Sequence, residues 1–423
     1  MIIVIPFVCF LLCALHQWTK NGKRVDISTF IATMYGASAF ISILLVGSGE
    51  WRHDVSFIAT IFYCMLLMMN LYPFLKYSNL RIANIQPLCS DKLLKLLAWV
   101  VFFWFVIMTY ISITWIIEVL TGDMDAIRSA MYRDEGGDGG GMVALPGPAR
   151  LVLALLNLCF SNPWVLMMLA FFCLYIQKTS VIYFLLFFIA SFSGPVNGIM
   201  NANRSAGTYW LISLLVVYLF FSSYIPPKHK IALKSFLLVA VGGVVLYLSA
   251  MTLSRFGEDD GGVEGSLLYY LGQSYPYFCY FFDEFEPAFT NLNLLFPCTA
   301  QFLLGEELVG GVNLQEEMTW KTGVPTGVFY TYLGQIRIFC GMLTMFLFAI
   351  IYHLVARSQL AKIKYASCTL KDVFVYLGFS SIMFLGLFGY SYASPVATFS
   401  IIFFWFFINK ISKRKKVIVE EKQ

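Results

Sequence analysis

The feature that most constrains this chain is a series of apolar runs long enough to cross a lipid bilayer. A transmembrane helix needs about 20 predominantly apolar residues, and about eleven segments meet or approach that length. Only 13% of the 423 residues are charged, which is too few to cover a water-soluble protein of this size. The sequence therefore predicts an all-α, polytopic transmembrane helical bundle, organised as a single membrane domain over 1–423. The predicted spans lie near 2–17, 28–48, 55–74, 94–117, 151–176, 180–194, 207–225, 231–252, 327–355, 372–390 and 394–409.

Three of these runs have individual features. The first has no basic residue ahead of it, so we expect a retained span and not a cleaved signal peptide. The fifth contains Asn162-Pro163, and we expect a kink there because proline interrupts helical hydrogen bonding. The sixth is short, and the last two form a tight hairpin around 390–394.

The basic residues of the connecting segments alternate from one side to the other. Every second connection carries Lys or Arg, whereas the loops 118–150 and 253–326 hold most of the acidic residues. Cytoplasmic loops are enriched in Lys and Arg, so the pattern predicts an N-terminus outside and a cytoplasmic C-terminal tail, 410–423. The expected location is a bacterial inner membrane. The segments predicted to be cytoplasmic are 18–27, 75–93, 177–179, 226–230, 356–371 and 410–423.

The larger predicted outer loop is rich in aromatic residues. Its part at 266–297 is dense in Tyr and Phe, a composition opposite to that of disordered segments. We expect interfacial helices there, which either seat a lipid-linked substrate or cap the bundle. The smaller loop has a glycine-rich run at 136–141, which predicts either a flexible lid or a flexible connection with no further role. It lacks the lysine of a phosphate-binding loop.

Arginines on the outer side are candidates for binding an anion. Arg204 and Arg255 lie at membrane–loop junctions where the charge rule disfavours them, and the planar guanidinium bonds a diphosphate bidentately. Pairing with an outer acid is the alternative. Arg128 and Arg133 lie among acidic residues and are weaker candidates. Arg337 lies inside the ninth run and is expected to face the bundle interior, either as a functional group or in a buried pair.

The sequence indicates no metal site and no cofactor. The four histidines are scattered, no Cys/His spacing matches a zinc site, and most cysteines lie in apolar runs. A disulfide between Cys279 and Cys298 in the large outer loop is an open alternative. We expect no nucleic-acid partner.

Three short blocks resemble Wzy-type oligosaccharide repeat-unit polymerases, the family that builds O-antigen and capsular polysaccharide. The stretch TGVPTGVFYTYLGQIRIFCG at 322–341 looks like that family's T-x-x-G-x-[FY]-x-x-x-G-x-x-G block, although Gln335 stands where many relatives carry a small residue. NANRSAGTYWLISLL at 201–215 is similar to the family's Arg-containing start of a span, and AIRSAMYRDE at 126–135 resembles its segment before an extracytoplasmic loop. The blocks cover about a tenth of the chain, and the general layout also matches.

The resemblance implies a glycosyltransferase that uses undecaprenyl-diphosphate-linked oligosaccharide. It would transfer the growing glycan from one carrier onto the next lipid-linked repeat unit at the outer face, and its fold would be GT-C-like. A flippase and a chain-length regulator would be its partners. In this reading the outer arginines hold the diphosphate, and a carboxylate accepts the proton of the attacking hydroxyl. The carboxylate candidates are Glu258, Asp259, Asp283 and Glu284, and the further substrate-binding candidates are Arg128, Arg133, Tyr330 and Arg337.

Three other functions remain open at this stage. An O-antigen-ligase-like transferase has the same layout and differs in its acceptor. A polysaccharide flippase or transporter is disfavoured because polar residues gather on one face and no inverted pair of broken helices stands out. A non-catalytic membrane scaffold is the third.

Overall fold

The described part of the protein is entirely helical apart from a single isolated β-bridge. The computed structural model describes residues 2–51, 53–121, 147–200, 205–256, 268–269, 271–283, 295, 330–390, 392 and 394–412. Five of the described helices are long and apolar enough to cross a membrane, and a sixth span is counted if one bent pair is joined. The prediction of an all-α, multi-pass helical membrane protein is therefore confirmed.

Most helices begin and end near the predicted boundaries. The first four long helices are α1 (Val4–Lys20), α2 (Ile27–Gly47), α3 (Phe57–Lys76) and α4 (Lys92–Thr121), with the short turn η1 (Asn79–Arg81) between the last two. They are followed by α6 (Gly147–Phe160), α7 (Pro163–Phe171), the π-helical turn η3 (Phe172–Ile176), α8 (Val181–Ala190), α9 (Ser193–Met200), α10 (Ser205–Phe221) and α11 (Pro227–Phe256). The last described helices are α13 (Ser274–Asp283), α16 (Tyr332–Cys340), α17 (Met342–Lys362), α18 (Leu370–Leu385) and α19 (Pro395–Ile411).

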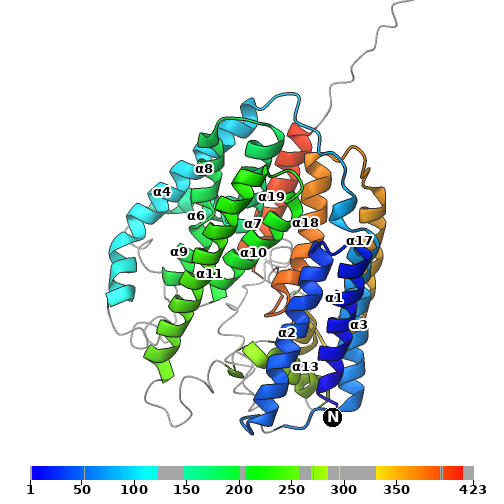
Figure 1. The fold of residues 1–423 in the computed structure, drawn as a ribbon. Helices are drawn as coiled ribbons and strands as arrows, with labels where there is room; N and C mark the ends of the chain where they lie inside the picture. Colours follow the sequence, from blue (N-terminus) through cyan, green and yellow to red (C-terminus); the bar gives the residue numbers. More distant parts are fainter. Residues whose placement is uncertain are drawn as a thin grey trace, which may run out of the picture.

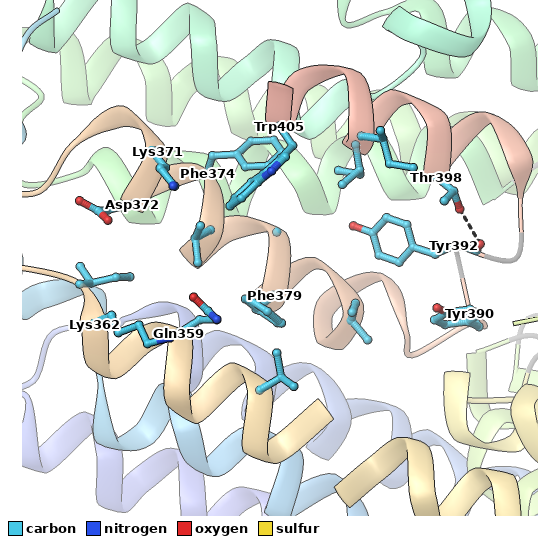
Figure 2. A pocket seen from close by; sticks show the side chains of 17 residues that line it. Gln359, Lys362, Lys371, Asp372, Phe374, Phe379, Tyr390, Tyr392, Thr398 and Trp405 are labelled. Atoms are coloured by element: carbon cyan, nitrogen blue, oxygen red, sulfur yellow. Dashed lines mark hydrogen bonds between the residues drawn. The ribbon is translucent and has the colours of Figure 1, made fainter. Parts of the chain in front are cut away.

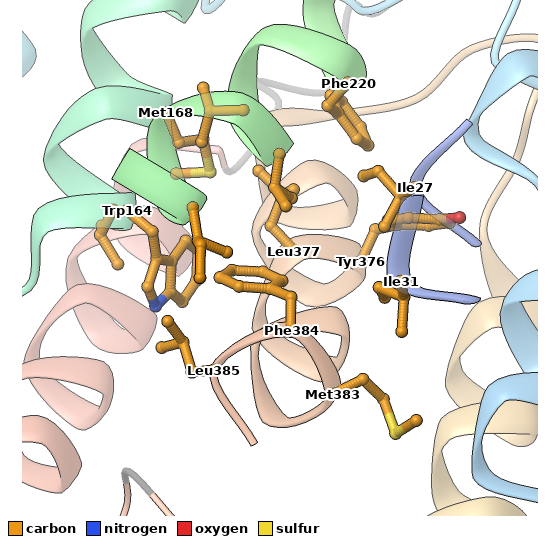
Figure 3. Close-up of a cluster of buried hydrophobic side chains, with 14 of the residues drawn as sticks. Ile27, Ile31, Trp164, Met168, Phe220, Tyr376, Leu377, Met383, Phe384 and Leu385 are labelled. Atoms are coloured by element: carbon orange, nitrogen blue, oxygen red, sulfur yellow. The ribbon is translucent and has the colours of Figure 1, made fainter. Parts of the chain in front are cut away.

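The helices form two groups with α18 between them. On one side α1, α2 and α3 pack together and α17 packs on α3, while on the other α4, α7, α8, α9 and α10 contact one another (Figure 1). Helix α18 touches both groups through α2, α3, α10 and α17. One flank of α18 borders a groove beside α17 and α19 (Figure 2), and another flank lies in the apolar core (Figure 3).

Aromatic contacts hold α18 in place. Trp164 of α7 packs on Phe374 with ring centres 5.5 Å apart, and Phe220 of α10 packs on Tyr376 at 5.5 Å. Burying an aromatic side chain removes a large apolar area from solvent, so these contacts join the two groups into one bundle.

The outer surface of the helices is strongly apolar. Tyr110 of α4, Leu238 of α11, Leu343 of α17 and Phe406 of α19 are all at least two-thirds exposed. Soluble proteins rarely expose such continuous apolar surface. These side chains are positioned to contact lipid.

Five of the segments predicted to be cytoplasmic meet at one end of the bundle. Backbone hydrogen bonds join Ala83 N to Tyr365 O (2.8 Å) and Gln86 N to Cys368 O (2.8 Å). Ile27 N donates to Asn79 Oδ1 (3.1 Å), Leu88 N donates to Gln177 Oε1 (2.7 Å), and the ring of His229, in 226–230, lies 6.0 Å from that of Tyr175. Ser412, near the start of the sixth segment, lines the same small pocket as Cys89 and Leu370. We call this the basic end; the N-terminus and α13 lie at the opposite end (Figure 1).

Helix breaks account for the main differences from the predicted boundaries. The fifth run bends by 62° between its two parts at Asn162-Pro163, which confirms the predicted kink. The sixth run continues past 194, because α9 extends the apolar helical segment to Met200. The prediction of one continuous ninth span was wrong, because Gly341, with φ +88°, separates α16 from α17.

Candidate functional site

Helix α16 and its flanking residues 330–341 form a buried segment that contains the candidates Tyr330 and Arg337. Thr331 caps the helix, since its side-chain oxygen accepts a hydrogen bond from Gly334 N. The helix ends at Gly341, whose positive φ is a conformation that glycine adopts readily. All but one of the nine helical residues are buried, although the helix is too short to cross a membrane.

The direction of α17 follows from its pairing with α3. Phe62 packs on Phe346 with ring centres 5.2 Å apart, and seven residues later His353 Nδ1 lies 2.6 Å from Met69 O. The two contacts are seven residues apart on α3 and seven residues apart on α17, in the same order. The two helices therefore run parallel with matched register. The start of α17 is therefore level with the start of α3, at the end opposite to the basic end.

Helix α16 runs in the opposite direction to α17. The Asn70 Nδ2 amide donates to Tyr332 Oη at 2.6 Å, and Asn70 lies about 18 Å along α3 from the level at which α17 begins. Tyr332, at the start of α16, is thus deep in the bundle, whereas Gly341 is level with the start of α3. Residues 330–341 are the first arm of a helical hairpin that runs toward the end opposite to the basic end and returns as α17.

Arg337 lies on this arm, inside the bundle. Its side chain is 7% exposed, so the prediction that it faces the interior is confirmed. Its position differs from the prediction, because it belongs to the short arm and not to a continuous span. A buried guanidinium costs several kcal/mol of desolvation unless its surroundings compensate, so its retention in an apolar segment needs an electrostatic reason.

Aromatic packing places Tyr330 and Asp283 in one region. Tyr330 is buried, and its ring packs edge-on against Phe281 of α13 at 5.6 Å. Asp283 is the last residue of α13, two positions from Phe281, and it is exposed. The structure therefore brings Tyr330 and α13 together, but Asp283 and Phe281 lie two positions apart on a helix and so face different directions, and this contact does not place the carboxylate beside Tyr330.

Helix α13 packs into the end of the bundle opposite to the basic end. Within the segment 266–297, predicted to lie at the membrane interface, Tyr275, Phe278 and Cys279 of α13 are buried against α2, α3 and α16. Tyr275 Oη lies 2.6 Å from Thr60 Oγ1. Gly272, just before α13, allows close approach, since an added Cβ would lie 3.0 Å from Ile41 O. The buried side chains of α13 favour the second alternative given for this loop, a cap on the bundle, and the position of α13 relative to the bilayer stays a prediction. Cys298, the proposed disulfide partner of Cys279, lies outside the described residues.

The remaining predicted site residues are less fully placed. Arg255 belongs to the last turn of α11, which extends to Phe256 and thus beyond the predicted end at 252. Arg128, Arg133, Arg204, Glu258, Asp259 and Glu284 lie outside the described residues. Their assignments stay predictions.

The sequence did not identify the two polar residues that hold α16. Asn70 is a fully buried amide within the apolar α3, and a polar residue inside a membrane span is the signal that marks it. Gln335, noted above only as a departure from the family block, accepts a hydrogen bond from Tyr390 N through its side-chain oxygen. These contacts join the first turn of α16 to α3 and to the α18–α19 connection.

The arrangement places a buried guanidinium and two buried phenols on one short arm in the half of the bundle away from the basic end. Within the described part of the chain, no three His, Cys, Asp or Glu side chains gather as metal ligands would. Comparisons with known proteins find no matching family model, no matching curated protein and no matching solved structure.

Proposed function

We propose that this chain is a membrane glycosyltransferase that polymerises oligosaccharide repeat units carried on undecaprenyl diphosphate. The observation that carries the proposal is Arg337, a buried guanidinium on a short helical arm that ends at Gly341, at the end of the bundle opposite to the basic end. The sequence block that resembles the repeat-unit polymerases, 322–341, includes this arm. A donor on the outer face must be activated in advance, and a lipid diphosphate leaves as an anion that such a cation stabilises.

The proposed topology has about eleven spans, with the N-terminus outside and the basic end in the cytoplasm. Its support is the convergence of five Lys- or Arg-containing segments at one end, with the sixth beginning there. In this orientation α13 and the α16–α17 hairpin open toward the outer leaflet, where the lipid-linked substrates would be. The fold class this implies is a GT-C-like bundle with a large extracytoplasmic loop.

The reaction breaks the bond between the anomeric carbon of the donor glycan and the diphosphate oxygen. A hydroxyl of the next repeat unit attacks that carbon and gives its proton to a carboxylate, for which Glu258 and Asp283 are the candidates. The lipid diphosphate departs with the bonding electrons. Arg337, together with Arg204 and Arg255, is proposed to stabilise its charge.

The test is glycan chain length in cells that depend on this chain. We expect Arg337→Gln, Arg204→Ala and Arg255→Ala each to reduce chain extension on the order of 10²-fold, as the removal of a transition-state donor does. The matched control is Arg357→Ala, which removes an exposed arginine of α17 near the basic end. It should leave the ladder of glycan chain lengths on a gel unchanged. Arg337→Lys keeps the charge and separates loss of the fork geometry from loss of the cation.

Membrane levels of each variant are measured beside the glycan. A normal-length ladder from Arg337→Gln would overturn the proposal. Long chains that accumulate on the carrier in the absence of the protein would indicate a ligase instead, because loss of a polymerase leaves single repeat units.

A second candidate is a transporter of lipid-linked glycan, and broken helices favour it. Transporters place discontinuous helices at their substrate sites, and the described residues include the 62° bend at Asn162-Pro163 and the reversal at Gly341. The two functions differ in where single units accumulate. Loss of a polymerase leaves them displayed outside, whereas loss of a transporter leaves them facing the cytoplasm.

A further inference from the structure

A lipid-accessible groove runs along α18 between α17 and α19. It encloses about 750 Å³, which is within the size range of small-molecule sites. Its walls are mainly apolar, including Val375, Phe379 and Ile382 of α18 and Ile402 of α19 (Figure 2). Apolar side chains that line it on both sides are exposed, namely Val355 of α17 and Ile402 and Trp405 of α19. The groove therefore opens onto the surface that contacts lipid.

The length of the groove matches one leaflet of a bilayer. Along α18 it extends from Lys371 to Ile382, eleven residues or about 16 Å of helix. The hydrocarbon core of a bilayer is about 30 Å thick, so the groove reaches from the basic end to about the midplane. A chain that enters at the basic end would fill it without crossing into the other leaflet.

The two ends of the groove differ in charge. At the basic end it is lined by Lys362, Lys371, Gln359 and Asp372, and at the deep end by Tyr390, Tyr392 and Thr398 (Figure 2). The Asp372 carboxylate accepts hydrogen bonds from Thr369 N (2.9 Å) and Thr369 Oγ1 (2.8 Å). This carboxylate is therefore hydrogen-bonded to Thr369, the N-cap residue of α18. Among the described residues, neither lysine forms an ion pair. Lys371 Nζ lies 5.0 Å from the centre of the Trp405 ring, which holds the ammonium at the mouth of the groove.

We propose that this groove binds one anionic phospholipid of the cytoplasmic leaflet, with its phosphate at Lys362 and Lys371 and an acyl chain along α18. The net positive charge at the mouth complements an anionic headgroup, and the apolar walls match a chain of single-leaflet length. The proposal rests on the orientation given above and not on glycan transfer. The lipid carrier of the proposed reaction acts at the outer end, so this is a separate site.

Photocrosslinking in proteoliposomes tests the site. The full-length protein is reconstituted with phosphatidylglycerol that carries a diazirine halfway along one acyl chain, and the labelled peptides are mapped after illumination. We expect labelling of the peptides that contain Ile382 and Ile402. A phosphatidylethanolamine probe with the same chains should label them at least fivefold less.

Two variants separate charge from shape. Lys362→Gln/Lys371→Gln should reduce phosphatidylglycerol labelling at least fivefold, because the phosphate loses both cations. Lys20→Gln/Lys76→Gln is the matched control, since it removes two lysines at helix ends of α1 and α3 outside the groove, one of them also over an aromatic ring. Val375→Trp retains the lysines and fills the groove, and it should also abolish labelling.

Equal labelling by phosphatidylethanolamine, or undiminished labelling of the lysine variant, would overturn the proposal. So would competition by polyprenyl phosphate but not by unlabelled phosphatidylglycerol, because it would assign the groove to a carrier lipid. Glycan chain length in the same variants distinguishes this test from that of the proposed function, since loss of labelling with a normal ladder supports the lipid site alone.

Discussion

At the scale of single residues, the buried pair of Asn70 and Tyr332 determines how α16 is held. The amide donates to the phenolic oxygen at 2.6 Å, and that phenol also lies 3.4 Å from Met383 Sδ. Both residues are fully buried. A hydrogen bond with no competing water is costly to leave unmade, so the pair fixes the deep end of the arm to α3 and α18.

We expect Tyr332→Phe to destabilise the protein by about 1–3 kcal/mol, because the Asn70 amide keeps its buried donor and loses its acceptor. The measurement is the thermal midpoint of the purified protein in detergent. Tyr110→Phe is the control, since Tyr110 is 78% exposed. Asn70→Leu/Tyr332→Phe should be less destabilised than the sum of the single variants, and strict additivity would contradict direct coupling.

At the residue scale, the sequence predicts the burial of single polar residues but not which residues pair. Arg337 is visible in the sequence because a cation in an apolar run is rare, and its burial agrees with that reasoning. The partner of Asn70 was beyond reach, because Tyr332 is 262 positions away and no local pattern connects the two. From one sequence, each member of a buried polar pair is seen only as a polar residue in an apolar run, and nothing indicates that the two are partners.

At the scale of elements, the decisive feature is the reversal between α16 and α17. Averaged hydropathy joins 327–355 into one run, because apolar residues stand on both sides of Gly341. The break comes from a single backbone conformation, φ +88° and ψ 170°, that averaging does not detect. The kink at Asn162-Pro163 was predictable, because proline acts through its own ring and its missing N–H.

We expect Gly341→Ala to cost about 1–3 kcal/mol of stability, because a side chain is strained in that backbone region. Glycan chain extension should fall with it, since the arm that carries Arg337 shifts. Gly242→Ala is the matched control, because Gly242 lies within α11 and an added Cβ meets nothing within 4 Å. Alanine also favours helix there, so the control should be neutral or slightly stabilised. Equal behaviour of the two variants would exclude strain at the reversal.

At the scale of the whole molecule, sidedness is the property on which the proposed function depends. Cys89 is exposed in the predicted cytoplasmic segment 75–93. Cys368 lies at the same end, and burial raises the pKa of its thiol. Because the thiolate is the reactive form, Cys368 should react slowly even where reagent reaches that end.

We expect an impermeant maleimide to label Cys89 only after spheroplasts are lysed, and Cys368 only after unfolding. Gly310→Cys in a Cys298→Ser background is the opposite test, since the predicted outer loop should be labelled in intact spheroplasts. Comparison with Cys89→Ser identifies the cytoplasmic signal. Labelling of Cys89 before lysis would reverse the orientation and remove the basis for an outer active site.

The main-chain bonds between 83–86 and 365–368 have a mechanical consequence. They join the segment that follows α3 to the segment that follows α17, so these two helices are connected through their C-terminal ends at the basic end. A 20-residue helix is about 30 Å long, so a tilt of about 5° around the connected end moves the free end by about 2.6 Å. Splaying of this kind would leave those main-chain bonds intact and would separate Phe62 from Phe346 at the far end. Under the proposed function, it would widen the route inward for a sugar headgroup.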